Sequence, residues 1–331
     1  MKTPRPCGPL STWVSLTLTG EDPGPAPAVT TRDPLLDRDL QLALWTLYEL
    51  HYAGFDDVDD AWEWNPEVLA FRAELEAPFE AALRSLAAPL VPSVTSVPEG
   101  SDALVELLEE IIEAAPSSGL AQHLQRRADL DQFTHFMRLR SIYHLKESDP
   151  QTFVVARVPG DVKVAVSELQ YDEFGAGRTE MLHQTLFAEA LKACDLDPTY
   201  GVYIDEVDAA TLAVNNTMSL FSLHRRLRGA SLGHLAAFEA TSTMPCRRIA
   251  GGVRRLGLPE AAAAYFDEHV EADAVHEQIA LRDICGRAVT AEPALASDIV
   301  FGAAACLAVD HLSGLHLLRT WGLDLDAEGA A

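Results

Sequence analysis

Apolar residues recur every three to four positions along most of the chain from Leu35 onward, which is the period of amphipathic helices. Loops rich in Pro, Gly and Asp, such as "DDVDDAWEWNP" and "VPSVTSVPEG", separate the helical stretches. Strict alternation of apolar and polar residues is nearly absent, and "TFVVARV" is the best strand candidate. The pattern therefore predicts an all-α protein of eight or more helices packed as a bundle.

The domain organisation follows from changes in this pattern. Residues 1–34 are rich in Pro, Thr and Gly and predict a flexible leader. Residues 35–331 predict a single helical domain, in which N-terminal helices within 35–100 pack on a larger bundle at 101–323. Within that bundle, Gly119–Ser148 predicts one long helix stopped by Asp149-Pro150, and helical texture returns over Val162–Cys194.

Charge and cysteine usage narrow the function classes. The chain has 331 residues and a net charge of −25, so nucleic acid and anionic membrane surfaces are disfavoured partners. Five scattered cysteines without a CxxC pair indicate reduced thiols. The start "MKTPRPCGPL" lacks the apolar run of a signal peptide, and "IVFGAAACLAV" is too short to cross a bilayer. We expect a cytoplasmic protein with no membrane association.

The stretch "YFDEHVEADAVHEQI" contains the clearest candidate chemistry. His269, Asp273 and His276 are spaced by four and three residues, so on a helix they fall within about 60° of arc. Phe266 and Ile279 lie on the same stripe, which places the polar trio on the face that should be buried. Imidazole and carboxylate groups are ligands for iron, manganese and zinc. The alternative is a solvated face on which the histidines are incidental.

A metal site in a helix bundle needs further ligands from facing helices, and candidates lie upstream. Glu147 falls at the last turn of the predicted long helix, in "HLKESDP". Glu173, Glu180 and His183 fall on the next helical stretch. Glu180 and His183 are three apart and share a helix face, whereas Glu173 and His183 are about 80° out of alignment unless Gly175 and Gly177 bend the segment.

Four motifs together resemble one family. "HLKESDP", "QYDEFGAG…MLH", "SLFSLHRRLRGASLGHLAAFEATS" and "YFDEHVEADAVHEQ" are similar to the haem-oxygenase-like di-iron oxidases and oxygenases, the bacterial "iron-containing redox enzymes". The resemblance covers roughly Leu35 to Trp321 and is sharpest in the H-x3-D-x2-H helix. It implies a seven-helix haem-oxygenase-like fold that binds no haem, with additional N-terminal helices in this chain.

The resemblance also implies a ligand set and a cofactor. Two Fe(II) ions would be held by six side chains and would react with O2 as co-substrate. The ligands carried over are Glu147, Glu173, His183, His269, Asp273 and His276. Glu180 remains an alternative to Glu173, because some members take the Glu three residues before the His. Glu239 is an additional candidate, because others use a Glu from the helix before the late triad.

The resemblance implies O2-dependent oxidation of a small molecule, such as N-oxygenation of an amine, desaturation, or oxidative C–C cleavage of an amino acid or fatty acid; an amine or amino acid is the substrate class we favour. The resemblance is compatible with an electron donor as a partner and with assembly of the chain as a homodimer. Arg225, Arg226 and Arg228 are candidates to bind a substrate carboxylate, although basic clusters usually form surface pairs. Candidate pocket or core aromatics are Tyr171, Tyr203 and Trp45.

Three rival functions remain. A thiaminase-like or metal-free binding domain of the same fold would use a cysteine such as Cys194 or Cys246. A haem-degrading enzyme would need an early proximal histidine such as His51, but the many carboxylates argue against haem. The third rival is an acidic helical interaction protein.

Overall fold

The computed structural model describes residues 1–91 and 100–323, and in residues 271–274 it describes the backbone but not the side chains. The expected loop "VPSVTSVPEG" lies mostly outside this range. The described chain is helical, with no β-strand in either range, so the all-α prediction is confirmed. The helices are α1 (Pro9–Leu18), α2 (Arg38–Glu49), α3 (Pro66–Ala87), α4 (Ser101–Ala114), α5 (Leu120–Arg126), α6 (Leu130–His144), α7 (Asp149–Val155), α8 (Gly160–Glu173), α9 (His183–Ala193), α10 (Ala209–Leu223), α11 (Arg228–Arg255), α12 (Ala261–Gln278), α13 (Arg287–Ala291) and α14 (Ala296–Thr320).

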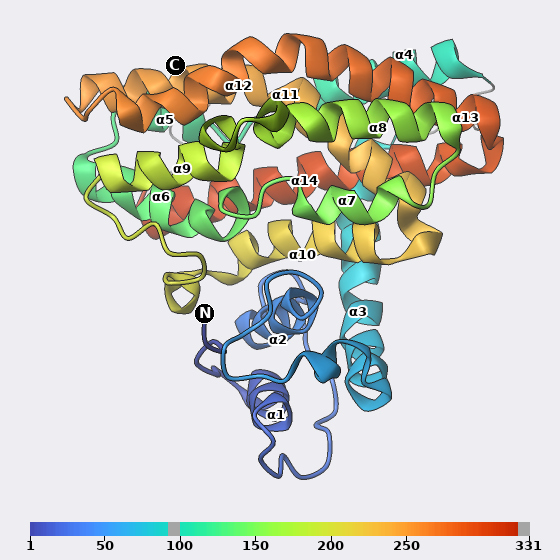
Figure 1. Cartoon of the computed structure of the whole chain (residues 1–331), viewed down its shortest axis with the longest axis vertical. Coiled ribbons are helices and arrows are strands. Elements are labelled where there is room, and N and C mark those ends of the chain that lie inside the picture. The colour runs from blue at the N-terminus through green and yellow to red at the C-terminus, as the bar shows by residue number, and fades with distance from the viewer. Residues whose placement is uncertain (92–99, 324–331) are drawn as a thin grey trace.

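The long helices α11 and α14 pack closely in the middle of the bundle, with α10 beneath them and α12 alongside α11 (Figure 1). Glycines permit this close approach. A Cβ added at Gly233 would lie 1.9 Å from the carbonyl oxygen of Ile299, and one at Gly302 would lie 1.9 Å from that of Ala230. The two backbones are therefore in contact at positions where a larger residue has no space.

Helix α14 explains the apolar stretch near the C-terminus. Pro293–Thr320 is the one described helix that is long and apolar enough to cross a membrane by length and composition, and 67% of its most apolar window is buried inside the protein. The helix is longer than the apolar run picked out in the sequence. Its composition follows from its central position, because neighbouring helices surround it and it needs few polar residues.

The N-terminal segment differs from the prediction of a flexible leader. Helix α1 buries Leu10, Trp13, Val14 and Leu18 in the same core as α2 and α3, and these three helices form the lower part of the molecule in Figure 1. Trp13 packs against Phe71, with the two rings tilted and their centroids 4.4 Å apart. The Pro- and Gly-rich composition hid this helix, because its few apolar residues find their partners only in the folded chain.

Three other elements depart from the sequence predictions. The first part of "TFVVARV", residues 152–155, belongs to α7, and residues 156–158 form a turn after it. The predicted long helix over Gly119–Ser148 is divided into α5 and α6, because Asp129 accepts a hydrogen bond from the backbone N–H of Gln132 (2.8 Å) and starts a new helix. Pro150 does not stop a helix but lies in the first turn of α7, where its missing N–H has no consequence.

The stretch Val162–Cys194 is also divided, into α8 and α9. Gly175, Ala176 and Gly177 all have positive φ angles, of 76°, 51° and 81°, and a right-handed helix cannot continue through them. Glu173 is consequently the last residue of α8 and His183 the first residue of α9. The break resolves the misalignment of these two residues, since they no longer share a helix.

Candidate metal centre

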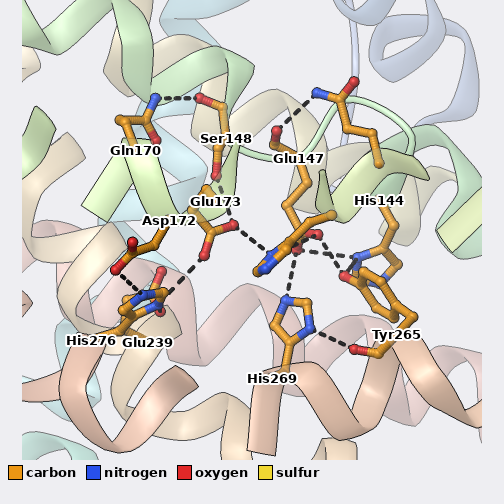
Figure 2. Close-up of polar contacts among 12 residues, drawn as sticks. His144, Glu147, Ser148, Gln170, Asp172, Glu173, Glu239, Tyr265, His269 and His276 are labelled. Carbon is orange, nitrogen blue, oxygen red and sulfur yellow. Dashed lines mark hydrogen bonds and ion pairs between the residues drawn. The ribbon is translucent and has the colours of Figure 1, made fainter. Parts of the chain in front are cut away.

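Side chains from five elements meet in the interior of the bundle. Glu147 lies in the turn after α6, Glu173 ends α8, and His183 begins α9. Glu239 lies in the middle of α11, and α12 provides the two histidines His269 and His276. All six side chains are buried. Figure 2 shows His269 and His276 directed toward Glu147 and Glu173.

The first group consists of Glu147, Glu173, His183 and His269, whose ligand-type atoms all lie within 4.8 Å of one another. His183 Nδ1 is 3.0 Å from Glu173 Oε2 and 4.0 Å from Glu147 Oε2. His269 Nε2 is 3.6 Å from Glu147 Oε1. Two imidazoles and two carboxylates thus surround one small volume.

The second group consists of Glu173, Glu239 and His276, again within 4.8 Å. His276 Nδ1 lies 3.5 Å from Glu173 Oε1 and 3.4 Å from Glu239 Oε2. Glu173 belongs to both groups, because its Oε2 faces His183 and its Oε1 faces His276. One carboxylate therefore faces both groups.

Outer contacts orient the ligand-type side chains (Figure 2). His269 Nδ1 is 2.8 Å from the carbonyl oxygen of Tyr265, and this contact orients the ring so that Nε2 faces Glu147. The Tyr265 hydroxyl donates to Glu147 Oε2 (2.7 Å) and lies 2.6 Å from His144 Nδ1. Such contacts fix the tautomer and direction of a metal ligand.

Ser148 connects the two carboxylates of the first group. It follows Glu147 directly and has a φ angle of 68°, an unfavourable conformation for a residue other than glycine. Its hydroxyl donates to Glu173 Oε2 (3.0 Å), and its carbonyl accepts from Gln170 (2.8 Å). The unfavourable backbone conformation of Ser148 thus coincides with a hydrogen bond from its hydroxyl to Glu173, the carboxylate that faces both groups.

The charges in the cluster stabilise one another. Burial acts to raise the pKa of Glu147, but the charge of His269 and hydrogen bonds from His144 and His269 outweigh it and hold the pKa well below its usual range. Burial likewise opposes ionisation of Glu173, and contact with His183 lowers its pKa overall. For His183, burial lowers the pKa, and the contact with Glu173 raises it overall. Anionic carboxylates are thus available to a cation.

The ligand-type atoms of the first group are placed better for binding a metal ion than for hydrogen bonding to one another. His183 Nδ1 is buried and has no hydrogen-bond partner among the described residues, although Glu173 Oε2 is only 3.0 Å away. Two lone-pair atoms that close, without hydrogen-bond geometry, are arranged like ligands facing a common cation. Imidazoles with carboxylates form the donor set of non-haem iron.

Several sequence candidates lie elsewhere. Glu180 is exposed in a short 3₁₀ turn and does not share a helix face with His183, so the geometry favours Glu173 and Glu239 over it. The side chain of Asp273 lies outside the described residues, although its backbone is helical. Asp172, which the sequence did not single out, places Oδ2 3.5 Å from His276 Nε2.

Two of the three candidate arginines are paired with acidic residues. Arg226 pairs with Glu80 (2.6 Å) and Arg228 with Glu292. Tyr171 is exposed and Trp45 is part of the core; the Tyr203 hydroxyl accepts from the backbone N–H of Asp197 (2.7 Å).

The surroundings of His51 and Cys194 do not favour the rival functions. His51 contacts Glu63 (3.0 Å) and Arg72, and burial raises the pKa of the Cys194 thiol to about 11, which disfavours a nucleophilic thiolate.

Sequence reasoning assigned no role in the site to Tyr265, His144 or Ser148. His144 and Ser148 flank Glu147 by three and one residues, and Tyr265 precedes His269 by four. The available signal for His144 and Tyr265 was therefore their position, about one helical turn before a candidate ligand. No local signal identifies Ser148, because its role depends on the distant Glu173.

A helical bundle with a buried carboxylate–histidine cluster is the architecture of non-haem metal proteins. Residues 134–311, just over half of the chain, match the family model described as "Iron-containing redox enzyme". The chain belongs to this haem-oxygenase-like family.

One solved structure supports the fold. A CADD-like protein of unknown function from Nostoc punctiforme, at 1.35 Å resolution, is similar with a TM-score of 0.52 and 16% identity, over 66% of this chain and 94% of that one. A 2.00 Å structure with the same description gives a TM-score of 0.49 and 18% identity, over 73% and 98% of the two chains. No curated protein sequence matches the chain.

Proposed function

We propose that this protein is a non-haem di-iron oxidase or oxygenase, which uses O2 to oxidise a small molecule such as an amine or amino acid. The observation that supports this most strongly is Glu173, whose two oxygens face two separate groups of buried ligand-type atoms. Membership of the iron-containing redox enzyme family identifies iron as the metal of this proposal.

The proposed first iron is held by Glu147, Glu173, His183 and His269. The proposed second iron is held by Glu173, Glu239 and His276, with Asp273 added by the family resemblance. Two ferrous ions in such a site would supply electrons for the reduction of O2.

The chain's own residues prepare the site for this chemistry. Tyr265 holds His269 through its carbonyl oxygen and Glu147 through its hydroxyl, so both ligands of the first group keep their direction. Ser148 fixes Glu173 in the position shared by the two groups. Burial of all six described side chains excludes bulk water, which strengthens their electrostatic interactions.

The partners of the proposal are a small-molecule substrate and an electron donor that restores the ferrous state. We also propose that the protein is located in the cytoplasm. A net charge of −25 argues against nucleic acid as a partner.

Anaerobic titration with Fe(II), followed by counting of bound metal, tests the proposal. We expect two irons per chain in the unaltered protein. Glu173→Gln should weaken both sites, and Glu239→Gln should weaken one. Glu180→Gln is the matched control, because Glu180 is an exposed glutamate in the same part of the chain, and it should bind iron normally.

Admission of O2 to the loaded protein should then consume O2 and oxidise the iron. A folded protein that binds no iron, or a single iron unaffected by Glu173→Gln, would contradict the proposal and favour a metal-free binding protein. Circular dichroism on every variant separates loss of metal from loss of fold.

A further inference from the structure

Asp172 connects the buried candidate metal centre with the protein surface. Its side chain is 45% exposed, whereas that of His276 is 2% exposed, and Asp172 Oδ2 lies 3.5 Å from His276 Nε2. The other ring nitrogen, Nδ1, faces Glu173 at 3.5 Å and Glu239 at 3.4 Å. The imidazole of His276 therefore lies between a carboxylate in contact with solvent and the second group of ligand-type residues (Figure 2).

The exposed carboxylate and the shared carboxylate are neighbours in the chain. Asp172 and Glu173 are the last two residues of α8, and both contact His276. Consecutive Cα atoms are about 3.8 Å apart. Glu173 in turn contacts His183, whose Nδ1 is buried and has no hydrogen-bond partner among the described residues. A cation held by Asp172 is thus one side chain away from the ligand-type atoms of the centre.

The charges at this end of α8 favour a cation. The C-terminal end of a helix carries a partial negative charge, which basic residues or cations compensate. Helix α8 has Asp172 and Glu173 in its last turn and no basic residue there. Glu168 lies four residues before Asp172 and is exposed, and like charges at this spacing repel. A cation bound at Asp172 relieves both unfavourable interactions.

We propose that Asp172 is the point at which divalent metal ions enter the centre. A hydrated cation is attracted by Glu168 and binds the carboxylate of Asp172, and it then passes the His276 ring to reach Glu173. The inference rests on the proposed function in one respect, namely that the cluster holds metal ions. Asp172 acts during loading and unloading, so it governs how fast metal enters and leaves and not how much is bound at equilibrium.

Stopped-flow mixing of the metal-free protein with Co(II), followed through the visible absorption of bound Co(II), measures the rate of entry. In about 0.1 M salt, Asp172→Asn should slow uptake about 10-fold, the effect of one charge on a divalent cation roughly 4 Å away after screening. Release of bound Co(II) to EDTA should slow by the same factor, because entry and exit use one route. The stoichiometry and the dissociation constant should stay unchanged.

Asp161→Asn is the matched control, because Asp161 is an exposed aspartate in the first turn of the same helix. It lies about 16 Å along the helix from Asp172, beyond the screening length of about 10 Å, and should leave the rate unchanged. Asp172→Glu keeps the carboxylate and should keep most of the rate.

Three results would overturn the proposal. They are an unchanged uptake rate in Asp172→Asn, equal slowing by Asp161→Asn, and a weakened equilibrium affinity with an unchanged uptake rate. The last result is the one expected if Asp172 only orients His276.

The outcomes are separable from those of the proposed function. Uptake that depends on Asp172, in a protein whose iron-loaded form does not react with O2, would support the entry route and reject the oxidase. Two bound irons that react with O2, with uptake independent of Asp172, would do the reverse.

Discussion

The buried ion pair between Glu49 and Lys146 makes the N-terminal helices part of the metal-site support. Glu49 ends α2 and is fully buried, and Lys146 directly precedes Glu147. Lys146 Nζ lies 2.9 Å from Glu49 Oε2, which also accepts from the Tyr200 hydroxyl at 2.8 Å. The Lys146 ammonium lies 4.4 Å from the centre of the Tyr52 ring. One contact therefore joins α2 to the turn that holds Glu147.

Lys146→Met removes the cation and leaves the Glu49 carboxylate buried with neutral partners. Breaking a buried pair in this way costs about 3–5 kcal/mol, a large part of a typical stability of about 5–15 kcal/mol. The double variant with Glu49→Leu should cost clearly less than the sum of the two single variants, because no uncompensated charge remains. Displacement of the turn should also weaken Fe(II) binding.

Urea unfolding followed by circular dichroism measures the change, with the midpoint and slope analysed together. Arg138→Met is the control, because Arg138 and Glu206 form a comparable contact (2.9 Å) that is partly exposed and should contribute less than about 1 kcal/mol. A Lys146→Met cost no larger than that of the control would refute the reasoning. A large cost with unchanged Fe(II) affinity would refute the link to Glu147.

Three further changes have defined outcomes. Gly302→Ala places a methyl group against a backbone carbonyl of α11 and should lower the free energy of unfolding, measured in urea, by at least about 2 kcal/mol. Gly160→Ala is the control and should be neutral or slightly stabilising, because no atom lies within 4 Å of the added Cβ. Equal effects of the two substitutions would contradict the close packing of α11 and α14. Burial lowers the pKa of His234 to about 4. The unfolded chain therefore binds a proton at this residue near pH 6.5, and the folded chain binds it only near pH 4. The contribution of His234 to the free energy of unfolding is consequently lost as the pH falls from 6.5 to about 4. Between pH 7 and pH 5 the loss should be about 2 kcal/mol, and His234→Phe should remove it; an unchanged pH dependence would show that the residue is not buried in its neutral form. Ser148→Ala should weaken Fe(II) binding by about 10-fold or more, because it removes the hydrogen bond to Glu173, and wild-type affinity in this variant would show that Ser148 does not position the shared carboxylate.

Local sequence determined the helical class and several of the buried cluster residues. The period of apolar residues is repeated over most of the chain and needs no knowledge of distant contacts. The spacing of His269 and His276 on α12 likewise follows from helix geometry alone, and both side chains are buried. The family likeness of residues 134–311 follows from the same motifs.

Tertiary structure decided which carboxylates enter the cluster. Glu180 has the better spacing to His183, but consecutive positive φ angles at residues 175–177 end the helix and leave Glu180 exposed. Glu239, on a helix far along the chain, comes within 3.4 Å of His276. Helical spacing predicts neighbours only while the helix continues, whereas contacts between helices depend on the whole packing arrangement.

The same reason explains why the sequence did not reveal α1 and could not decide the partners of the arginines. The N-terminal helix is short, and its apolar residues are buried only because α2 and α3 provide a surface for Trp13 and its neighbours. Arg226 and Arg228 are engaged by acidic residues from elsewhere in the chain. Sequence composition counts charges, but only the folded chain determines which charges meet.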